Sequence, residues 1–147
     1  TQRDKVRLDR EIDYIGNYLG IESVRYQDRL KVTYEIPGNL SGALVPSMVL
    51  QPLVENSIKH GPDATNEAVL ITVQARERDE RLELQVSDNG KGCSDVSSAM
   101  NNGGIGLRNV RDRLQLLYGD DARFELSSPH GRGFIVTLSF PLEYDRT

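Results

Sequence analysis

The stretch V-S-D-N-G-K-G, residues 86–92, places an aspartate directly after a strand-like alternation of apolar residues. An asparagine and two glycines accompany Asp88, and the same composition is found in tight surface turns. A hairpin would need a second strand at once, but residues 88–104 are rich in Gly, Asn and Ser and have no hydrophobic period. Structureless loops of this length in compact domains usually have a function. We therefore expect Asp88 to end a buried strand and to begin a functional loop.

Composition narrows the class of protein. The chain has 147 residues, 37% of them hydrophobic and 27% charged, which is typical of one soluble globular domain. The net charge is -4 with both signs interspersed, so we expect no nucleic-acid partner. The single cysteine, Cys93, excludes an internal disulfide. We find no apolar run near the roughly 18 residues of a membrane span and no secretory signal. The first residues, T-Q-R-D-K-V, suggest a piece of a longer protein.

Hydrophobic periodicity predicts an alternating order of helices and strands. The expected elements are a helix at 5–26, a strand at 30–36, a helix from near 46 to 61–62, strands at 69–75 and 82–86, a helix from near 107 to 119, and strands at 123–126 and 133–140. Neighbouring strands can pair as hairpins while helices cover one face of the sheet. The predicted fold class is therefore α/β, a two-layer α/β sandwich with a mixed, mostly antiparallel sheet covered on one face by helices.

The first helix has a narrow apolar seam. Its residues Leu8, Ile12, Ile15 and Leu19 are spaced 4, 3 and 4 apart. This spacing is compatible with a coiled coil and equally with a helix that packs on the body of the domain. The sequence leaves both alternatives open.

The second helix is predicted to have one buried face and one polar face. At about 100° per residue, the side toward the sheet gathers Leu50, Leu53, Val54, Ser57 and Ile58. Glu55, Asn56 and Lys59 project to the other side, with His60 nearer its edge. Such a face can be merely solvated, and Glu55 could pair with Lys59. Alternatively, Asn and Glu oxygens suit Mg²⁺, and Lys59 could meet a phosphate.

A glycine-rich stretch, N-N-G-G-I-G-L-R-N-V at residues 101–110, leads into the third helix. Unpaired N–H groups and the helix dipole at such a start can bind phosphate without basic side chains. The stretch is not a Walker loop, and Asn109 stands where the third glycine of a dinucleotide fingerprint would be. A flexible junction is the other interpretation.

Asp88 has the chemistry to select a purine base. A fixed carboxylate accepts a hydrogen bond from the N6 amino group of adenine, whereas guanine would present an acceptor to it. Gly90 and Gly92 would let the backbone approach a base and sugar closely. These residue types suit adenine recognition.

Three motifs follow one another along the chain: L-Q-P-L-V-E-N-S-I-K-H-G, D-N-G-K-G and G-G-I-G-L-R-N-V-R-D-R-L. They resemble the N box and the two glycine boxes of the GHKL superfamily. This superfamily includes gyrase, Hsp90, sensor histidine kinases and MutL. The chain is most similar to the ATP-binding catalytic domain of Lyt-type sensor histidine kinases. Their N-box pattern, Q-P-L-V-E-N-A-I-K-H-G, differs here only at Ser57. The resemblance extends from about residue 8 to 141 and implies a Bergerat-type sandwich.

The resemblance also implies roles for the second helix, with ATP and Mg²⁺ as cofactors. Asn56 would ligate the Mg²⁺ that bridges the ATP phosphates. Glu55 would act near the metal or the γ-phosphate as a catalytic residue. Lys59 and His60 would line the phosphate side, with Lys59 also assisting catalysis.

The two glycine boxes would form the rest of the pocket. By resemblance, Asp88 would hold the adenine amino group, Gly90 and Gly92 would shape the adenine pocket, and residues 93–103 would form an ATP lid. The residues that bring the start of the third helix to the phosphates would be Gly104, Gly106 and Leu107.

The chain departs from the superfamily patterns in three places. Gly133-Phe134 replaces a common Gly-Thr pair whose hydroxyl supports the adenine site, and Thr137 lies further on. Pro52 occupies the position of the catalytic glutamate of gyrase-like ATPases, which argues against that type of hydrolase. Neither of the two histidines lies in a phosphoacceptor motif, so we expect the acceptor histidine outside this chain.

The resemblance implies a domain organisation and a reaction. Residues 1–28 would be a linker helix leading from a missing dimerisation and phosphoacceptor domain, with its seam near the dimer axis, and residues 29–147 would be the ATP-binding catalytic domain. The intact protein would be a protein histidine kinase, a transferase of two-component signal transduction that moves the ATP γ-phosphoryl group to a histidine on its own dimerisation domain. A catalytically inactive, nucleotide-binding regulatory module is the alternative, supported by Phe134.

We also expect the surroundings of such a kinase. A response regulator would receive the phosphoryl group in a phosphorelay, and the intact protein would be a homodimer. Membrane anchoring would lie in segments outside this chain, which would be the cytoplasmic domain of a membrane-anchored bacterial receptor. A serine kinase of the anti-sigma type shares the fold, but the Lyt-type first helix argues against it.

Overall fold

The computed structural model describes residues 4–26, 29–60, 68–90, 105–128 and 133–145. The elements in chain order are β1 (Lys5–Arg7), α1 (Leu8–Arg25), β2 (Leu30–Glu35), the 3₁₀ turn η1 (Gly38–Leu40), β3 (Leu44–Pro46), α2 (Leu50–His60), β4 (Val69–Arg78), β5 (Arg81–Asp88), α4 (Ile105–Tyr118), the 3₁₀ turn η2 (Gly119–Asp121), β6 (Arg123–Ser127) and β7 (Phe134–Pro141).

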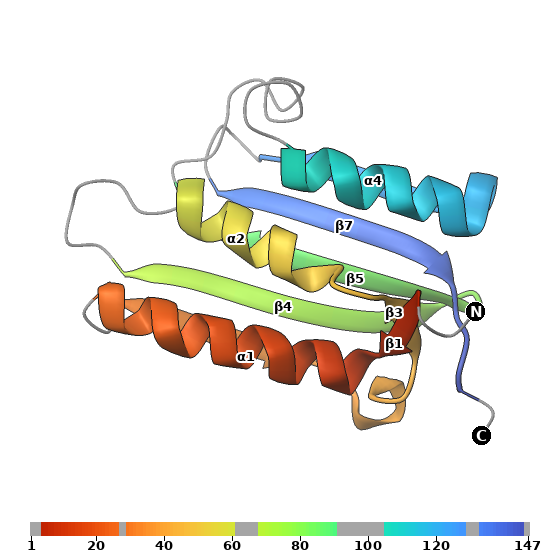
Figure 1. Cartoon of the computed structure of the whole chain (residues 1–147), viewed down its shortest axis with the longest axis horizontal. Coiled ribbons are helices and arrows are strands. Elements are labelled where there is room, and N and C mark those ends of the chain that lie inside the picture. Colours follow the sequence, from red (N-terminus) through yellow and green to blue (C-terminus); the bar gives the residue numbers. More distant parts are fainter. Residues whose placement is uncertain (1–3, 27–28, 61–67, 91–104, 129–132, 146–147) are drawn as a thin grey trace.

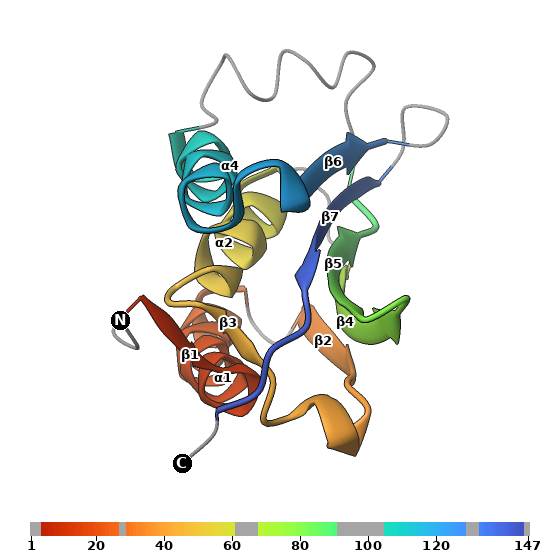
Figure 2. The ribbon, with the colours of Figure 1, turned by 90° about the vertical axis from the view of Figure 1, so that its right-hand side faces the viewer.

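A five-stranded sheet forms one layer of the molecule, with strand order β2-β4-β5-β7-β6. The pair β2–β4 is parallel, and the other three pairs are antiparallel. Helices α1, α2 and α4 lie side by side on one face of this sheet (Figures 1 and 2). The predicted two-layer sandwich with a mixed, mostly antiparallel sheet is therefore confirmed.

Alternation along the strands separates a buried face from a polar face. Residues such as Ile71, Leu84 and Leu138 point toward the helices and are buried. The opposite face carries polar cross-strand pairs, for example Arg76 with Glu83, whose Nε and Oε1 atoms are 2.9 Å apart. A sheet covered on one side only is expected to have this pattern.

Two predicted element boundaries in the first 50 residues are wrong. Residues 5–7 are not helical but form β1, which pairs antiparallel with β3. Because Pro46 belongs to β3, α2 begins only at Leu50 and not near Pro46. Both three-residue strands are too short to show a hydrophobic alternation, so only their mutual pairing defines them.

The seam of α1 packs on the body of the domain. Leu8 and Ile15 are fully buried and Leu19 is 4% exposed, all within the core shared with the sheet. The coiled-coil alternative is wrong, because the domain's own core already covers this seam.

Two turns define strand and helix ends. Asp79 and Glu80 have φ angles of 55° and 64° and form a tight turn between β4 and β5, so these strands are longer than predicted. Gly119, with φ of 59°, follows the last residue of α4, as predicted from its position after the apolar period.

In the described part of the chain, no helix has the length and apolarity that a membrane span requires.

Replacing Phe140 tests the packing of the two layers. Its ring is fully buried and stacks on Tyr118 with 4.9 Å between ring centroids. We expect Phe140→Ala to lower the free energy of unfolding by about 3–5 kcal/mol, measured by urea denaturation. Leu116→Ala, at a position 84% exposed on α4, is the control and should change it by less than about 0.5 kcal/mol. Equal effects of the two substitutions would contradict this packing.

Candidate functional site

Asp88 is the last residue of β5, and the register fixes the face on which it lies. Its partners directly opposite are Ile71 in β4 and Phe134 in β7, both buried on the helix side of the sheet. The Asp88 Oδ1 atom accepts a hydrogen bond from the Gly90 backbone N–H at 2.8 Å. The carboxylate is thus held in a local turn on the covered face, as the sequence predicts for the end of a buried strand.

Asn89 attaches this turn to the neighbouring strand. Its Oδ1 atom accepts a hydrogen bond from the Leu70 backbone N–H at 2.8 Å, and its Nδ2 atom donates one to the Ala68 carbonyl at 3.0 Å. The side chain therefore continues the β4–β5 pairing past Asp88. Sequence reasoning did not identify this role, although the Asn in D-N-G was a visible signal for a side chain that bonds to backbone.

Gly133 closes the turn from the side of β7. Its N–H donates a hydrogen bond to the Gly90 carbonyl at 2.8 Å. Its φ is 66°, and a Cβ atom there would lie 2.7 Å from the Asp88 carbonyl oxygen. Only glycine fits both the conformation and the space. The backbone of Asp88 is therefore held from both neighbouring strands.

The missing threonine hydroxyl is not replaced by Thr137. Phe134 lies on the covered face opposite Asp88 and is 6% exposed. Thr137 is three residues further along β7 and so points to the other face of the sheet, where its Oγ1 accepts a hydrogen bond from Gln85 at 3.1 Å.

Helix α2 has the two faces predicted for it. All five side chains expected to face the sheet are buried: Leu50, Leu53, Val54, Ser57 and Ile58. Glu55 and Lys59 are exposed and Asn56 is half-buried. The Glu55 Oε1 atom accepts a hydrogen bond from Gln51 Nε2 at 2.8 Å. Between the described side chains of Glu55 and Lys59 there is no ion pair.

The start of α4 lies against the polar side of α2. A Cβ atom on Gly106 would be 3.5 Å from the Pro52 Cβ, so the two helices approach closely here. Asn56 follows Pro52 by four residues and therefore projects from the same side, one turn further along. The first turn of α4 contains no acidic residue, and helix geometry leaves its first N–H groups without partners inside the helix. The side of α2 that carries Asn56 thus faces the start of α4.

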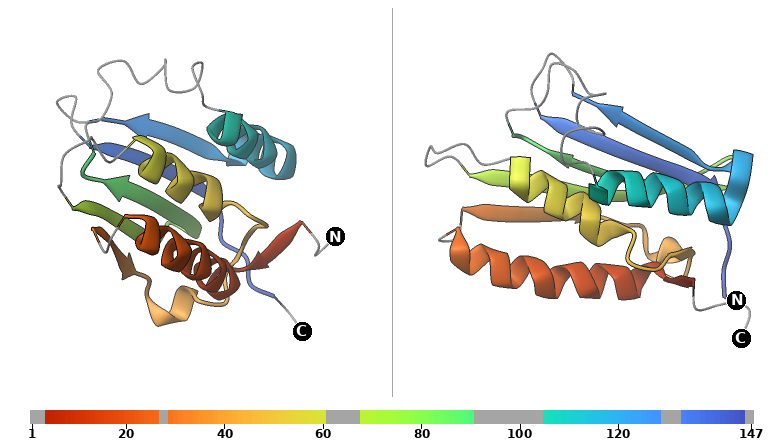
Figure 3. Two further views of the ribbon diagram at one scale, coloured as in Figure 1. Left: turned by 60° about the vertical axis from the view of Figure 1, so that its left-hand side comes forward. Right: turned by 45° about the horizontal axis from the view of Figure 1, so that its top comes forward.

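The remaining predicted residues divide into two groups. The side chain of Leu107 is 2% exposed and belongs to the core, so only its backbone can face a phosphate. Gly92, Gly104 and the expected lid at 93–103 lie outside the described residues, as does the side chain of His60. The N-terminal end of α4 lies beside the body of α2, and the C-terminal end of α2 extends past it (Figures 1 and 3).

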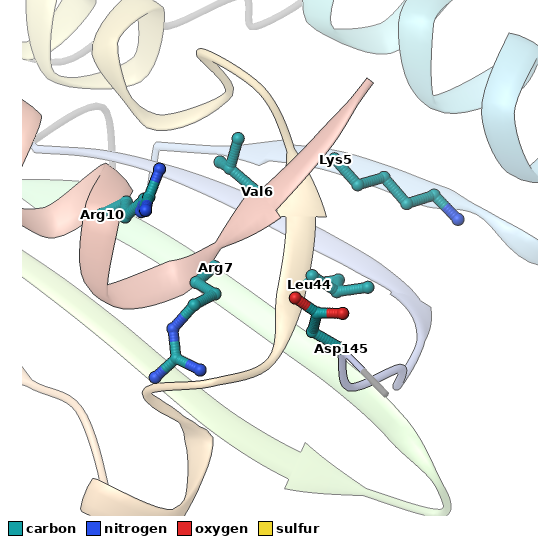
Figure 4. Close-up of a pocket in the computed structure, with 6 residues that line it drawn as sticks. All are labelled: Lys5, Val6, Arg7, Arg10, Leu44 and Asp145. Carbon is teal, nitrogen blue, oxygen red and sulfur yellow. The ribbon is translucent and has the colours of Figure 1, made fainter. Parts of the chain in front are cut away.

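A cavity of about 210 Å³ lies elsewhere, at the start of α1. It is lined by Lys5, Val6, Arg7, Arg10, Leu44 and Asp145 (Figure 4). Lys5 is paired with Glu143 at 2.6 Å and Arg7 with Asp9 at 2.9 Å, and the Arg7 hydrogen bond lowers the pKa of Asp9. Because two of its three cations are already paired, the cavity is a poor site for a phosphate.

Known proteins share the sequence and the fold. A family model described as "Histidine kinase-, DNA gyrase B-, and HSP90-like ATPase" matches residues 45–144. The chain belongs to this family. The match confirms the resemblance stated from the three motifs, and it supports ATP as the nucleotide that this domain uses.

Curated relatives of this ATPase domain include sensor kinases. The chain is 30% identical over 141 residues to the sensor histidine kinase YesM of Bacillus subtilis and 35% identical over 136 residues to the sensor histidine kinase BtsS of Escherichia coli K12. These matches cover 95% and 92% of the chain but 24% of each relative. The chain thus spans about a quarter of their length.

Solved structures show the same fold at low identity. The mycobacterial sensor histidine kinase MprB superposes with a TM-score of 0.69 at 16% identity, covering 96% of this chain and 98% of that chain. The catalytic domain of the histidine kinase ThkA gives a TM-score of 0.71 at 16% identity, covering 96% and 97%.

Gly133→Ala tests the close approach at Asp88. The added methyl group would be strained at positive φ and would clash with the Asp88 carbonyl, so we expect the free energy of unfolding to fall by about 1–3 kcal/mol. Gly16→Ala is the matched control, because Gly16 lies in α1 with nothing within 4 Å of a Cβ atom. It should be neutral or stabilising by up to about 1 kcal/mol. Thermal unfolding of both variants measures the difference, and equal stability would contradict the geometry.

Proposed function

We propose that this domain binds ATP with Mg²⁺ between α2, the start of α4 and the Asp88 end of the sheet, as the catalytic domain of a sensor histidine kinase. The observation that carries the proposal is the close approach of α4 to α2 at Gly106 and Pro52. It brings a helix N-terminus, suited to phosphate, beside the side of α2 that carries Asn56. Asp88 provides an acceptor on the same covered face of the sheet.

Each residue then has a role suited to its position. Asp88 would accept a hydrogen bond from the adenine amino group, with Gly90 and Gly92 beside the base. Guanine would place an oxygen against the Asp88 carboxylate and be rejected. Lys59 and His60 would line the phosphate side, and backbone N–H groups at 104–107 would bind phosphate oxygens.

The donor set fits Mg²⁺ delivered together with ATP. The described residues contain no cluster of three or more His, Cys, Asp or Glu side chains that could hold a metal alone. Mg²⁺ at nucleotide sites commonly uses one or two protein oxygens, several waters and the phosphates themselves. Asn56 would supply the protein oxygen, and the metal when bound would neutralise charge on the phosphates.

In the whole protein, the γ-phosphoryl group would move from ATP to a histidine ring nitrogen. The lone pair of the unprotonated ring nitrogen would form the phosphorus–nitrogen bond, and the bond between the γ-phosphorus and the bridging oxygen would break, its electron pair leaving with ADP. The chain would contribute mainly position and charge neutralisation, with Glu55, oriented by Gln51, near the reacting phosphate.

The acceptor and the partners would lie outside this chain. Residues 1–28 would lead from a dimerisation domain that bears the histidine, with α1 packed on the core of the catalytic domain at 29–147. The whole protein would be a homodimer, and a response regulator would receive the phosphoryl group. Other segments would anchor the protein in the membrane, with this domain in the cytoplasm. The inactive-module alternative is not favoured, because the curated relatives named here are sensor histidine kinases.

Calorimetric titration of the domain with ATP and Mg²⁺ tests the proposal. We expect ATP but not GTP to bind. Asp88→Asn should weaken binding by about 10- to 100-fold, because a charged hydrogen-bond acceptor is lost and an NH₂ group takes its place facing the base. Asn56→Ala should remove most of the Mg²⁺ dependence.

The control is Asp120→Asn, which neutralises an exposed carboxylate in η2. It should bind ATP like the wild type. If the folded wild type binds no ATP at millimolar concentration, or binds GTP equally well, the proposed function is wrong.

A further inference from the structure

The peptide group between Ser47 and Met48 precedes α2 and is held on both sides. Its N–H donates a hydrogen bond to Glu11 Oε1 of α1 at 2.6 Å. Its carbonyl oxygen accepts a hydrogen bond from Arg113 Nη1 of α4. The two groups of a trans peptide point in opposite directions. This single peptide therefore bridges α1 and α4. We refer to Glu11, the 47–48 peptide and Arg113 together as the peptide clamp.

Glu11 also supplies the negative charge that the start of α2 lacks. Its side chain is 4% exposed, and it is the one buried carboxylate among the residues that the structure describes. Its Oε1 atom accepts the hydrogen bond from the Met48 N–H, its Oε2 atom is buried without a hydrogen-bond partner among the described residues, and α2 has no acidic residue in its own first turn. Burial raises the pKa of Glu11, while the backbone N–H groups at 48–50 and the charge of Arg113 oppose that shift. Helix α1 thus caps α2 from outside.

The backbone at the peptide clamp is in a conformation that needs support. Met48 has φ of 63°, which non-glycine residues rarely adopt. The Ser47 N–H donates a further hydrogen bond to the Asp4 carbonyl at 2.9 Å. Such conformations persist where surrounding contacts determine them. The segment before α2 is therefore held by contacts from the N-terminal strand region, α1 and α4 together.

We propose that Glu11 and Arg113 are positioning residues that fix α2 against α4, so that the placement of α1 governs the affinity for MgATP. The inference rests on the proposed function. Its basis is that α2 carries Asn56 and α4 carries Gly106, the two sides of the phosphate and metal site. A shift of α1 would move Glu11, the start of α2 and hence Asn56 relative to the start of α4.

Affinity measured on folded variants tests the peptide clamp. At a temperature well below the unfolding midpoint of every variant, Glu11→Ala and Arg113→Ala should each weaken MgATP binding by about tenfold, within the range found for coupled neighbours. The controls are Asp13→Ala on α1 and Arg111→Ala on α4, which remove the same charges from exposed positions. They should stay within about twofold of the wild type. Glu11→Gln, which keeps an oxygen acceptor for Met48, should lose only about threefold.

A double-mutant cycle with Asn56→Ala separates positioning from simple stabilisation. If Glu11 acts through the placement of Asn56, Glu11→Ala should change affinity by less than about twofold once Asn56 is already alanine. A tenfold loss in both backgrounds, or a lower unfolding midpoint with unchanged affinity, would overturn the inference while the proposed function stands. A folded wild type that binds no MgATP would overturn both.

Discussion

The burial of one face of α2 against the sheet is the constraint on which the site depends. Five side chains of this 11-residue helix are buried, so its rotation about its own axis is fixed. Pro52 and Asn56 must then project away from the sheet, toward the side where α4 packs. No further interaction is needed for Asn56 to face the same space as the start of α4. Helix packing thus determines which atoms a ligand can meet.

The end of β5 shows how hydrogen bonds complete what packing begins. Alternation places Asp88 on the covered face, but the strand end would fray without partners. Asn89 attaches it to β4, and Gly133 approaches it from β7 with no side chain between them. Phe134 lies directly opposite, at the position where the resemblance leads us to expect a threonine hydroxyl, so a base held by Asp88 would lie beside an aromatic residue. Recognition of the base amino group would then depend more heavily on Asp88.

Many helices and strands of the fold could be predicted from short stretches of sequence, because hydrophobic spacing and turn residues act locally. The alternation that ends at Asp88, the apolar positions of α2 and the glycine after α4 each predicted an element within a few residues. Features made by distant pairing could not be predicted in this way. Strands β1 and β3 define each other across 37 or more residues, and Glu11 reaches Met48 over the same separation of 37. No window of the sequence contains both partners. The roles of Glu55, Asn56, Lys59 and Asp88 in binding stay predictions.

Amide NMR of the ¹⁵N-labelled domain during titration with MgATP is the most direct measurement, because it locates the ligand as well as detecting it. Binding between α2, α4 and the end of β5 predicts the largest shifts at Asn56, Gly90 and Gly106, with little change at Val6, Arg10 and Leu44 around the other cavity. Largest shifts at the cavity residues, or none anywhere at millimolar MgATP, would contradict the proposed site.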